Sequence, residues 1–469
     1  MSKQKYPGVY IEELSSLPPA VAQVETAIPA FIGYTKKAVN TSNSVLFEPI
    51  RISSLLEYER VFGVAYNESQ LVINVEDAAM SSRMSFSSDT VWSPYKMYYA
   101  LQLFFANGGT ACYVISVGLY NQEHTDRVLY SDLKQGLDAA ANVDEITLLT
   151  LPDATGLQSH SDYYRVTHDI LQQCHTLKDR FAILNTYSDL TYNQEGASFN
   201  PVDAFRQFVT LDSEYLEYGA CYFPFLKTVL NYSYKSKQVE IRLKNRAGKN
   251  QVTTLKVLAK KDVKRYNKVK QFIKEHYVVL PPNAAIAGVY SRVDASRGVW
   301  KAPANISLNY VVEPTVAIPK NNVQALYVDA STGMSINPIK QFSGRGTMVW
   351  GARTLAGNDN EWRYVPVRRF FIMVEESILK ALKQFVFEIN DANTWAHVKM
   401  MVTNFLINQW RSGALQGTKP EDGFFVNVGL GETMTAQDIL DHKMIVEIGM
   451  AVVRPAEFII LRLNLVMQS

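Results

Sequence analysis

The chain has 469 residues, 47% of them hydrophobic, and a formal net charge of +2. This length and composition support two or more domains with real hydrophobic cores. The cysteines are Cys112, Cys174 and Cys221, an odd number spread far apart, which argues against a disulfide framework and fits a reducing compartment. No signal-peptide pattern and no apolar run of membrane-spanning length occur. We therefore expect a soluble protein made in a cytoplasm, without direct membrane insertion.

The start of the chain contains a short extended run that opens with a Pro-Gly turn. The run consists of Tyr6, Pro7, Gly8, Val9, Tyr10, Ile11, Glu12 and Glu13. A strand at a chain end cannot satisfy its backbone donors and acceptors within its own segment, so it must join a sheet of its own chain or of a neighbour. Residues 14–20 follow as a linker that includes Pro18 and Pro19.

The next region alternates strand and helix patterns. Strands are predicted at 30–34, 112–117, 146–151 and 181–184, and helices at 100–105 and 166–174. The sequence Asn-Gly-Gly at 107–109 is a good end for the first of these helices. A strand-helix-strand order usually gives parallel pairing with a right-handed crossover, so the pattern predicts an α/β architecture.

Charge is distributed unevenly along the chain. Residues 235–274 contain 14 Lys or Arg and two acids, which leaves 33 basic and 43 acidic residues elsewhere. Alternation of apolar and polar residues at 239–243 resumes at Leu255 and Val257, and a helical pattern follows Asp262, which predicts a basic β-β-α insertion. Its role stays open between a nucleic-acid surface, a solvated outer face and attraction to the acidic body of a neighbouring subunit.

The second half of the chain predicts longer helices and two terminal strands. Pro366 opens one helix, and Thr394 caps a second helix that ends near Gly413. A strand at 424–428 and a short helix starting at 435–438 come next. Strands are then predicted at 444–453 and 458–467. The last strand begins with Phe458, Ile459, Ile460, Leu461, Arg462, Leu463, Asn464 and Leu465.

Most signatures of catalysis are missing from the sequence. It has no Walker A loop, no G-x-S-x-G elbow and no H-E-x-x-H, and the G-x-G pairs at 344–346 and 429–431 do not complete a dinucleotide motif. We expect no catalytic, cofactor-binding or metal site. One alternative stays open, an α/β enzyme that uses Asp153 and Asn185, because these residues follow or end predicted strands, where ligand crevices form.

Several motifs resemble those of one family, the tail sheath proteins of contractile injection systems. This family includes contractile phage tails, R-type pyocins and phage-tail-like extracellular injection particles. The motifs are YPGVYIEE at 6–13, VETAIPAFIG at 24–33, NGG at 107–109, PP at 281–282, AGVY at 287–290, DASRGVWKAPAN at 294–305, VWGARTL at 349–355, WRYVPVRR at 362–369, GETMT at 431–435 and VVRPAEFIIL at 452–461. They cover both termini and most of the chain after about residue 281, but not the basic insertion.

The resemblance implies a mixed α/β fold, arranged as a multi-domain sheath protein. The implied parts are an N-terminal arm and linker at 1–25, an outer domain at 26–335 with the basic insertion at about 230–278, an inner tube-facing domain at 336–455, and a C-terminal arm at 456–469. The arm residues at 6–13 and 458–465 are implied to join sheets in neighbouring subunits.

The implied function is structural rather than enzymatic. Family sheaths form stacked six-fold rings around an inner tube, and their helical lattice contracts to drive the tube through a target membrane. The implied partners are further copies of the chain, the tube protein, and baseplate and cap proteins, with no nucleic acid and no cofactor. Assembly in a bacterial cytoplasm is implied, followed by a place in a phage tail, a released particle or a cell-anchored machine. A minor end-capping paralogue is the alternative within the family.

For contact with the tube, we nominate the polar residues of one short helix and the turn that follows it. These are Thr435, Gln437, Asp438, Asp441, His442 and Lys443. An ordinary packed surface helix is the alternative for this segment.

Overall fold

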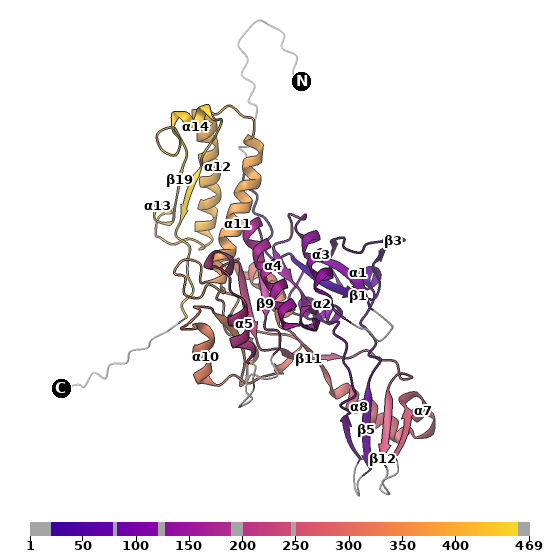
Figure 1. Cartoon of the computed structure of the whole chain (residues 1–469). Helices are drawn as coiled ribbons and strands as arrows, with labels where there is room; N and C mark the ends of the chain where they lie inside the picture. The colour runs from indigo at the N-terminus through magenta and orange to yellow at the C-terminus, as the bar shows by residue number, and fades with distance from the viewer. Residues whose placement is uncertain (1–19, 78–81, 121–126, 189–199, 245–249, 458–469) are drawn as a thin grey trace, which may run out of the picture. The chain divides into compact units, whose positions relative to one another are not determined.

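The computed structural model describes residues 20–77, 82–120, 127–188, 200–244 and 250–457 (Figure 1). These residues form two compact units. Unit 1 contains residues 20–24 and 374–453, and unit 2 contains the described residues between 25 and 373 together with 454–457. The predicted strands at 6–13 and 458–467 lie outside the described residues.

Unit 2 is built on a nine-stranded sheet. The strand order is β15-β18-β17-β10-β9-β8-β1-β7-β4. The strands are β1 (Pro29–Thr35), β4 (Ile50–Ile52), β7 (Cys112–Leu119), β8 (Leu148–Thr150), β9 (Phe181–Asn185), β10 (Gly219–Phe223), β15 (Ile306–Ser307), β17 (Ile336–Phe342) and β18 (Gly346–Val349). The six strands from β7 to β17 run parallel, which confirms the predicted parallel pairing, and antiparallel strands close both sides.

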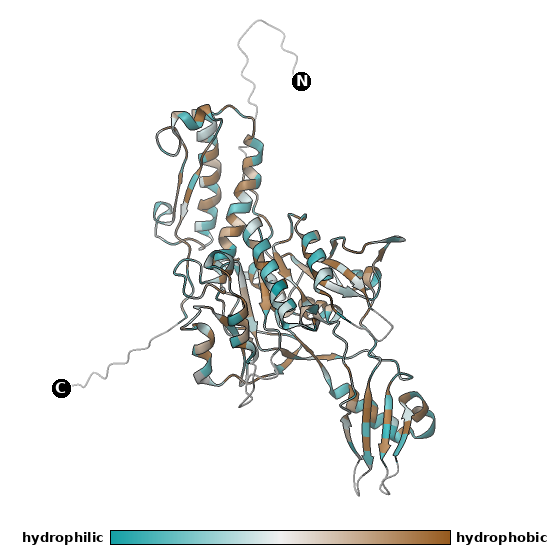
Figure 2. Ribbon diagram, in the orientation of Figure 1, coloured by the Kyte–Doolittle hydropathy of each residue, from teal (hydrophilic) through white to brown (hydrophobic). Residues whose placement is uncertain are grey.

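Helices cover both faces of this sheet. Phe31 of β1 meets Phe104 of α2 (Met97–Ala106), while Gly136 of α3 (Tyr130–Ala140) lies against Ile32. Because neighbouring residues of a strand point to opposite faces, α2 and α3 lie on opposite sides. α4 (His160–Leu177) and α6 (Ser213–Leu216) accompany α3, and α9 (Asn283–Arg297) accompanies α2. Figure 2 shows apolar residues along the central strands, as expected for a sheet buried on both faces.

The basic insertion is part of a small module with its own core. Its sheet has the order β13-β12-β5-β6, formed by β5 (Val72–Asp77), β6 (Ser82–Phe86), β12 (Glu240–Lys244) and β13 (Asn250–Thr254). α7 (Leu255–Lys261) and α8 (Val263–Glu275) pack on it through a core separate from that of the main sheet. The predicted hairpin and the helix capped by Asp262 are confirmed, since the Asp262 side chain accepts from the Arg265 N–H.

Two features of the module differ from the sequence prediction. Leu255 and Val257 belong to α7 rather than to a strand, because Thr254 caps a helix there and Leu255 and Leu258 face the core one turn apart. In addition, β12 pairs in parallel with β5, which lies more than 160 residues earlier in the chain, so the module contains two strands that local patterns did not assign to it.

Unit 2 contains several smaller elements. A three-stranded sheet has the order β14-β11-β16, from β11 (Leu226–Asn231), β14 (Tyr277–Leu280) and β16 (Val311–Pro314). The others are β2 (Val39–Asn40), β3 (Asn43–Ser44), α1 (Leu55–Phe62), a 3-10 turn at Pro152–Gly156, α5 (Pro201–Phe208) and α10 (Lys320–Tyr327).

Unit 1 is a pair of long helices with a two-stranded sheet. Its elements are the C-terminal half of α11 (Val365–Leu382), a 3-10 turn at Lys383–Phe385, α12 (Ala392–Arg411), α13 (Pro420–Gly423), β19 (Phe424–Asn427), α14 (Ala436–Leu440) and β20 (Glu447–Met450). The apolar stripe of α12 is buried at Val398, Met401, Val402, Phe405 and Leu406, while Trp395 is half-buried. The prediction that Thr394 caps α12 is wrong. The cap is Asp391, whose extended backbone lets its carboxylate accept from the Thr394 N–H at 2.9 Å.

The division into units lies inside α11. Met373 is the last residue of unit 2 in this helix, and Val374 is the first residue of unit 1. The sequence instead predicts a domain boundary between residues 335 and 336. β17 and β18 belong to the nine-stranded sheet, so the segment from 336 to 373 folds with unit 2. The assignment of an outer and a tube-facing domain stays a prediction.

Candidate functional site

Unit 1 carries a two-stranded sheet with open edges. β19 and β20 pair antiparallel, from Phe424 opposite Met450 to Asn427 opposite Glu447. In the described part of the chain, neither strand pairs with a third. Phe424 is buried on the side of α12 and Phe425 is half-exposed on the other side. Because an edge strand presents unpaired N–H and C=O groups, this sheet can accept further strands.

The chain that enters the predicted C-terminal arm is held by a buried arginine. Arg353 Nε donates to both carboxylate oxygens of Glu457, at 2.9 and 3.2 Å, and Nη2 donates to the same group. The Tyr364 hydroxyl adds a hydrogen bond of 3.3 Å. The hydrogen bonds that Arg353 donates to the Glu457 carboxylate raise the pKa of Arg353 above its ordinary value. We call Arg353, Tyr364 and Glu457 the C-terminal clamp; it fixes the backbone directly before residues 458–465.

A second arginine holds the chain that leaves the predicted N-terminal arm. Arg369 Nη2 donates to Asp294 Oδ2 at 2.6 Å and to the Thr26 carbonyl at 2.7 Å, and the Thr26 hydroxyl donates to Asp294 Oδ2 at 2.6 Å. The guanidinium lies over the Tyr290 ring, 4.4 Å from its centre. The Arg369 and Asp294 side chains are 3% and 7% exposed. We call Thr26, Asp294 and Arg369 the N-terminal clamp.

Both clamps are made of residues from the sequence motifs, but sequence reasoning did not find the pairs. Arg353 and Glu457 lie 104 residues apart, and Arg369 and Asp294 lie 75 apart. Local periodicity carries no information on such distant pairs. One signal for these pairs was present in the sequence, because charged residues lie among apolar ones in the motifs. A buried charge needs a partner, so each such residue predicts one elsewhere in the chain.

The predicted tube-contact residues lie at the cap of α14, on the helix and directly after it. Thr435 and Asp438 form a capping box: the Thr435 hydroxyl accepts from the Asp438 N–H at 3.2 Å, and the Asp438 carboxylate accepts from the Thr435 N–H at 2.9 Å. Hydrogen bonds from the Thr435 side chain and backbone lower the pKa of Asp438. These two residues therefore have a structural task within their own helix.

The remaining nominated residues are exposed. Gln437 Nε2 donates to Asp441 Oδ1 at 2.9 Å, and the Lys443 ammonium lies 3.3 Å from Asp441 Oδ2. His442 has a left-handed backbone, with φ of 59°. All four side chains are exposed, so they are available to a partner.

The connection between α11 and α12 exposes large apolar side chains that sequence reasoning missed. We call Val386, Phe387 and Ile389 the apolar tip; they are 59%, 103% and 75% exposed. Asn390 Nδ2 donates to the Lys443 carbonyl at 3.0 Å, so the apolar tip lies beside the α14 segment (Figure 1). Contiguous exposed apolar side chains usually mark an interaction site, so this end of unit 1 combines an apolar contact surface with a polar one.

The residues of the enzyme alternative are engaged in structural hydrogen bonds. Both Asp153 oxygens are occupied, by the N–H groups of Tyr34 at 2.7 Å, Lys96 at 2.5 Å and Met97 at 3.1 Å. The Asn185 side chain is buried and donates to the Thr186 carbonyl at 2.7 Å. Asp153 therefore joins the end of β1 to the start of α2, and the geometry assigns it to the framework.

The described residues contain neither a metal-binding cluster nor a membrane-spanning helix. No group of three or more His, Cys, Asp and Glu side chains in this part of the chain is arranged to hold a metal ion. Within the same residues, every helix is too short or too polar to cross a membrane.

The C-terminal region of the chain is similar to a known protein family. Residues 357–465 match the family described as the phage tail sheath C-terminal domain. The tail sheath protein of Vibrio phage KVP40 is 27% identical over 132 residues, which is 28% of this chain and 19% of that protein. The tail sheath protein of Enterobacteria phage T4 is 27% identical over 145 residues, 30% of this chain and 20% of that protein. These matches span about a fifth of the phage proteins.

Similarity to solved structures extends over the whole chain. The sheath complex of PVC, an extracellular contractile injection system, in its contracted state has a chain that is 30% identical, with a TM-score of 0.63, covering 99% of this chain and 98% of that one. The contracted helical sheath of the anti-feeding prophage gives 30% identity and a TM-score of 0.64, covering 98% and 99%. A chain in the contracted baseplate of the same particle is 27% identical, with a TM-score of 0.68, covering 99% of this chain and 98% of that one. The chain belongs to the sheath proteins of contractile injection systems.

Proposed function

We propose that this chain polymerises as stacked six-fold rings around an inner tube, and that contraction of the resulting helical lattice drives the tube through a target membrane. The observation that carries the proposal is the open β19–β20 sheet together with two clamped chain segments next to the predicted arms. One feature accepts strands, and the other anchors the segments that would supply them.

The proposed link is strand addition between copies. The arm residues 6–13 and 458–465 pair with the edges of β19 and β20 in neighbouring copies. Backbone pairing is directional and depends little on side chains, which suits a link that persists through a rearrangement. The clamps fix where each arm begins, and the linker at 14–20 gives the bodies room to move. Head-to-tail contacts that do not close on themselves produce a helical filament.

Contraction requires no catalysis by this chain in the proposed mechanism. It requires only that contacts between the bodies be more favourable in the second state. About 1 kcal/mol per subunit is sufficient when hundreds of subunits switch together, because the gains add along the lattice. We therefore propose a mechanical, non-enzymatic role.

The proposed tube contact consists of the apolar tip and the exposed residues Gln437, Asp441, His442 and Lys443. Replacing Phe387 and Ile389 by Ser removes most of the exposed apolar surface of the tip. We expect sheath polymers to form but to retain less than a tenth of the tube protein in co-sedimentation. The matched control is Leu379→Ser on α11, a 55% exposed leucine of the same unit, which should retain the tube. Equal retention by both variants would refute this contact.

A second candidate within the family is a minor, end-capping sheath chain. The specific observation is the similarity to a chain in the baseplate structure of the anti-feeding prophage, where the TM-score is 0.68. In either case we propose assembly in a bacterial cytoplasm, with baseplate and cap proteins as further partners, before the particle acts. A main sheath subunit polymerises without limit, whereas an end-capping chain stops after a ring.

Deletion of residues 1–13 tests the proposal. These residues precede the described chain, and removing them leaves both clamps and the β19–β20 sheet intact. We expect a folded monomer with the same melting temperature as the full chain, and no sedimenting polymer. Polymers that persist in the deletion variant would contradict strand exchange by this arm.

A further inference from the structure

The module that contains the basic insertion presents one strongly positive surface. Leu258, Val269 and Ile273 of its two helices face the core, and the lysines of the same helices are exposed. We call these residues the lysine face: Lys256, Lys260, Lys261, Lys264, Lys268, Lys270 and Lys274. The ion pairs recorded for residues 235–274 in the described part of the chain involve other side chains, Arg242, Lys244 and Arg265, and stay within the module.

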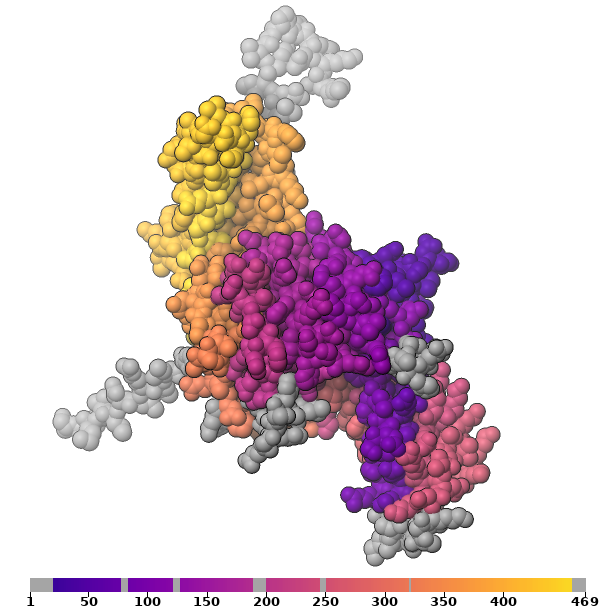
Figure 3. Space-filling view, viewed as in Figure 1, coloured from indigo at the N-terminus to yellow at the C-terminus, as the bar shows by residue number. Residues whose placement is uncertain are grey.

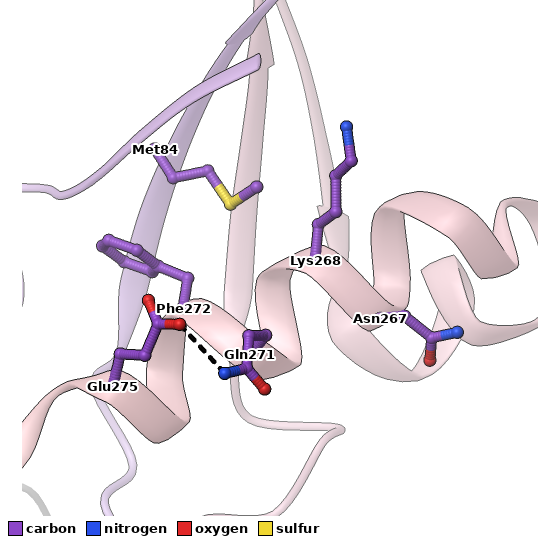
Figure 4. A pocket seen from close by; sticks show the side chains of 6 residues that line it. All are labelled: Met84, Asn267, Lys268, Gln271, Phe272 and Glu275. Carbon is purple, nitrogen blue, oxygen red and sulfur yellow. Dashed lines mark hydrogen bonds between the residues drawn. The ribbon is translucent and has the colours of Figure 1, made fainter. Parts of the chain in front are cut away.

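Apolar side chains accompany these charges. A hollow of about 510 Å³ lies between α8 and β6, lined by Met84, Phe272 and Lys268 among others (Figure 4). Val257 and Val263 are 39% and 58% exposed on the same two helices. Protein interfaces typically combine apolar contacts with a charged rim, so the lysine face has the make-up of a contact surface.

The helices on one face of the main sheet have the opposite charge. Residues 130–217 contain 14 acidic and five basic side chains. This segment includes α3, α4, α5 and α6, and Figure 3 shows much of it, in purple to magenta, on the surface of unit 2. We call five exposed acids of the segment the acidic layer: Asp138, Asp144, Asp203, Asp212 and Glu214. Among the described residues, no recorded ion pair joins the acidic layer to the lysine face.

We propose that the lysine face of one copy docks on the acidic layer of a neighbouring copy. This inference rests on the proposed polymerisation and names one of its body-to-body contacts. Each copy carries both surfaces, so the contact is heterologous and repeats along a lattice instead of closing into a dimer. A second copy is the favoured occupant because it supplies the complementary charge, five exposed carboxylates for the seven lysines.

Tethering makes such a contact effective. Exposed ion pairs are individually weak, and salt screens them over about 8 Å at 0.15 M. Strand exchange through the arms holds a neighbour nearby, and a tethered partner has an effective concentration on the order of millimolar. Many weak pairs then act together, and they can exchange partners while the arms stay linked. The lysine face is therefore a salt-sensitive contact that adds to the arms.

Charge exchange between two variants tests this contact. Variant one carries Lys260→Glu, Lys264→Glu and Lys268→Glu, and variant two carries Asp138→Lys, Asp144→Lys and Asp203→Lys. Each variant alone places like charges opposite each other. We therefore expect its polymerisation threshold, the lowest protein concentration at which polymers form, to be at least tenfold higher than that of the unchanged chain at 0.15 M salt. In an equimolar mixture, each contact between one variant and the other pairs opposite charges again, and alternation of the two along the lattice restores the contacts. We expect the polymerisation threshold of the mixture to return to within about twofold of that of the unchanged chain.

The controls separate this contact from folding and from polymerisation itself. Both variants should melt at the same temperature as the unchanged chain. Lys36→Glu, Lys37→Glu and Lys419→Glu introduce the same charge change at other exposed positions and should leave the threshold unchanged. If the unchanged chain fails to polymerise, this result contradicts both the proposed function and the proposed contact.

If the unchanged chain polymerises, two results overturn the contact alone. The first is a variant with the same polymerisation threshold as the unchanged chain. The second is a mixture of the two variants whose threshold stays as high as that of either variant alone. A variant one that polymerises normally but loses heparin binding would instead assign the lysine face to an anionic ligand.

Discussion

Single buried charges determine where the terminal segments leave unit 2. In the C-terminal clamp, the Arg353 side chain is 6% exposed and its partner Glu457 is 20% exposed. Removing one partner of a buried pair leaves an uncompensated charge, which typically costs about 3–5 kcal/mol. We therefore expect Arg353→Met to lower the free energy of unfolding of unit 2 by about 3 kcal/mol, measured by urea denaturation.

A surface pair of the same unit supplies the control for this effect. Lys227 Nζ lies 3.0 Å from Glu313, but the two side chains are 42% and 44% exposed. Water already solvates both charges, so Lys227→Met should change the free energy of unfolding by less than about 1 kcal/mol. Equal losses in the two variants would show that burial does not set the strength of the clamp.

Asp153 gives unit 2 a pH dependence of a definite sign. Burial raises the pKa of its carboxyl to about 6, against an ordinary value of 3.8, although three backbone N–H groups donate to it. The native state thus keeps the proton up to a higher pH than the unfolded chain. The stability from this group is full below pH 3.8 and is lost as the pH rises through about 6.

An asparagine at this position does not titrate. We expect the free energy of unfolding of the unchanged chain to fall between pH 4 and 7 relative to that of Asp153→Asn. Urea denaturation at a series of pH values measures both curves. Parallel curves over this range would contradict the raised pKa.

Among the elements, α12 has two candidate cap residues, Asp391 in the structure and Thr394 in the sequence prediction. Asp391 accepts from the Thr394 N–H, and losing such a cap exposes an unsatisfied helix donor. We expect Asp391→Ala to lower the melting temperature of unit 1 by roughly 2–4 °C. Thr394→Ala should have a smaller effect, and calorimetry compares the two. A larger loss for Thr394→Ala would restore the sequence prediction.

Elements that depend on local patterns could be predicted from the sequence. β1, β7, β9, α4 and α12 are all at the expected positions, because their apolar periodicity and end signals are local. The strand predicted at Leu255 failed because a two-residue alternation also fits one helical turn, and Thr254 decides in favour of the helix. The addition of β5 and β6 to the insertion module depends on long-range pairing, which a single sequence does not display.

For the whole molecule, the motifs predicted the family but not the geometry of the candidate site. The tube-contact nomination found α14 from its capping pattern, yet it missed the apolar tip, because exposed Val, Phe and Ile look like core residues in a sequence. The clamps were also missed, since their partners meet only in three dimensions. Arg353 and Arg369 show how far apart in sequence such partners lie.

Above all, we propose that the chain forms a contractile sheath around a tube. Electron microscopy of the purified chain, alone and with its co-expressed tube protein, tests it most directly. We predict hollow, helically striated cylinders of constant width with six-fold symmetry, and cylinders that enclose the tube when it is present. Monodisperse monomers in both samples would contradict the proposed sheath.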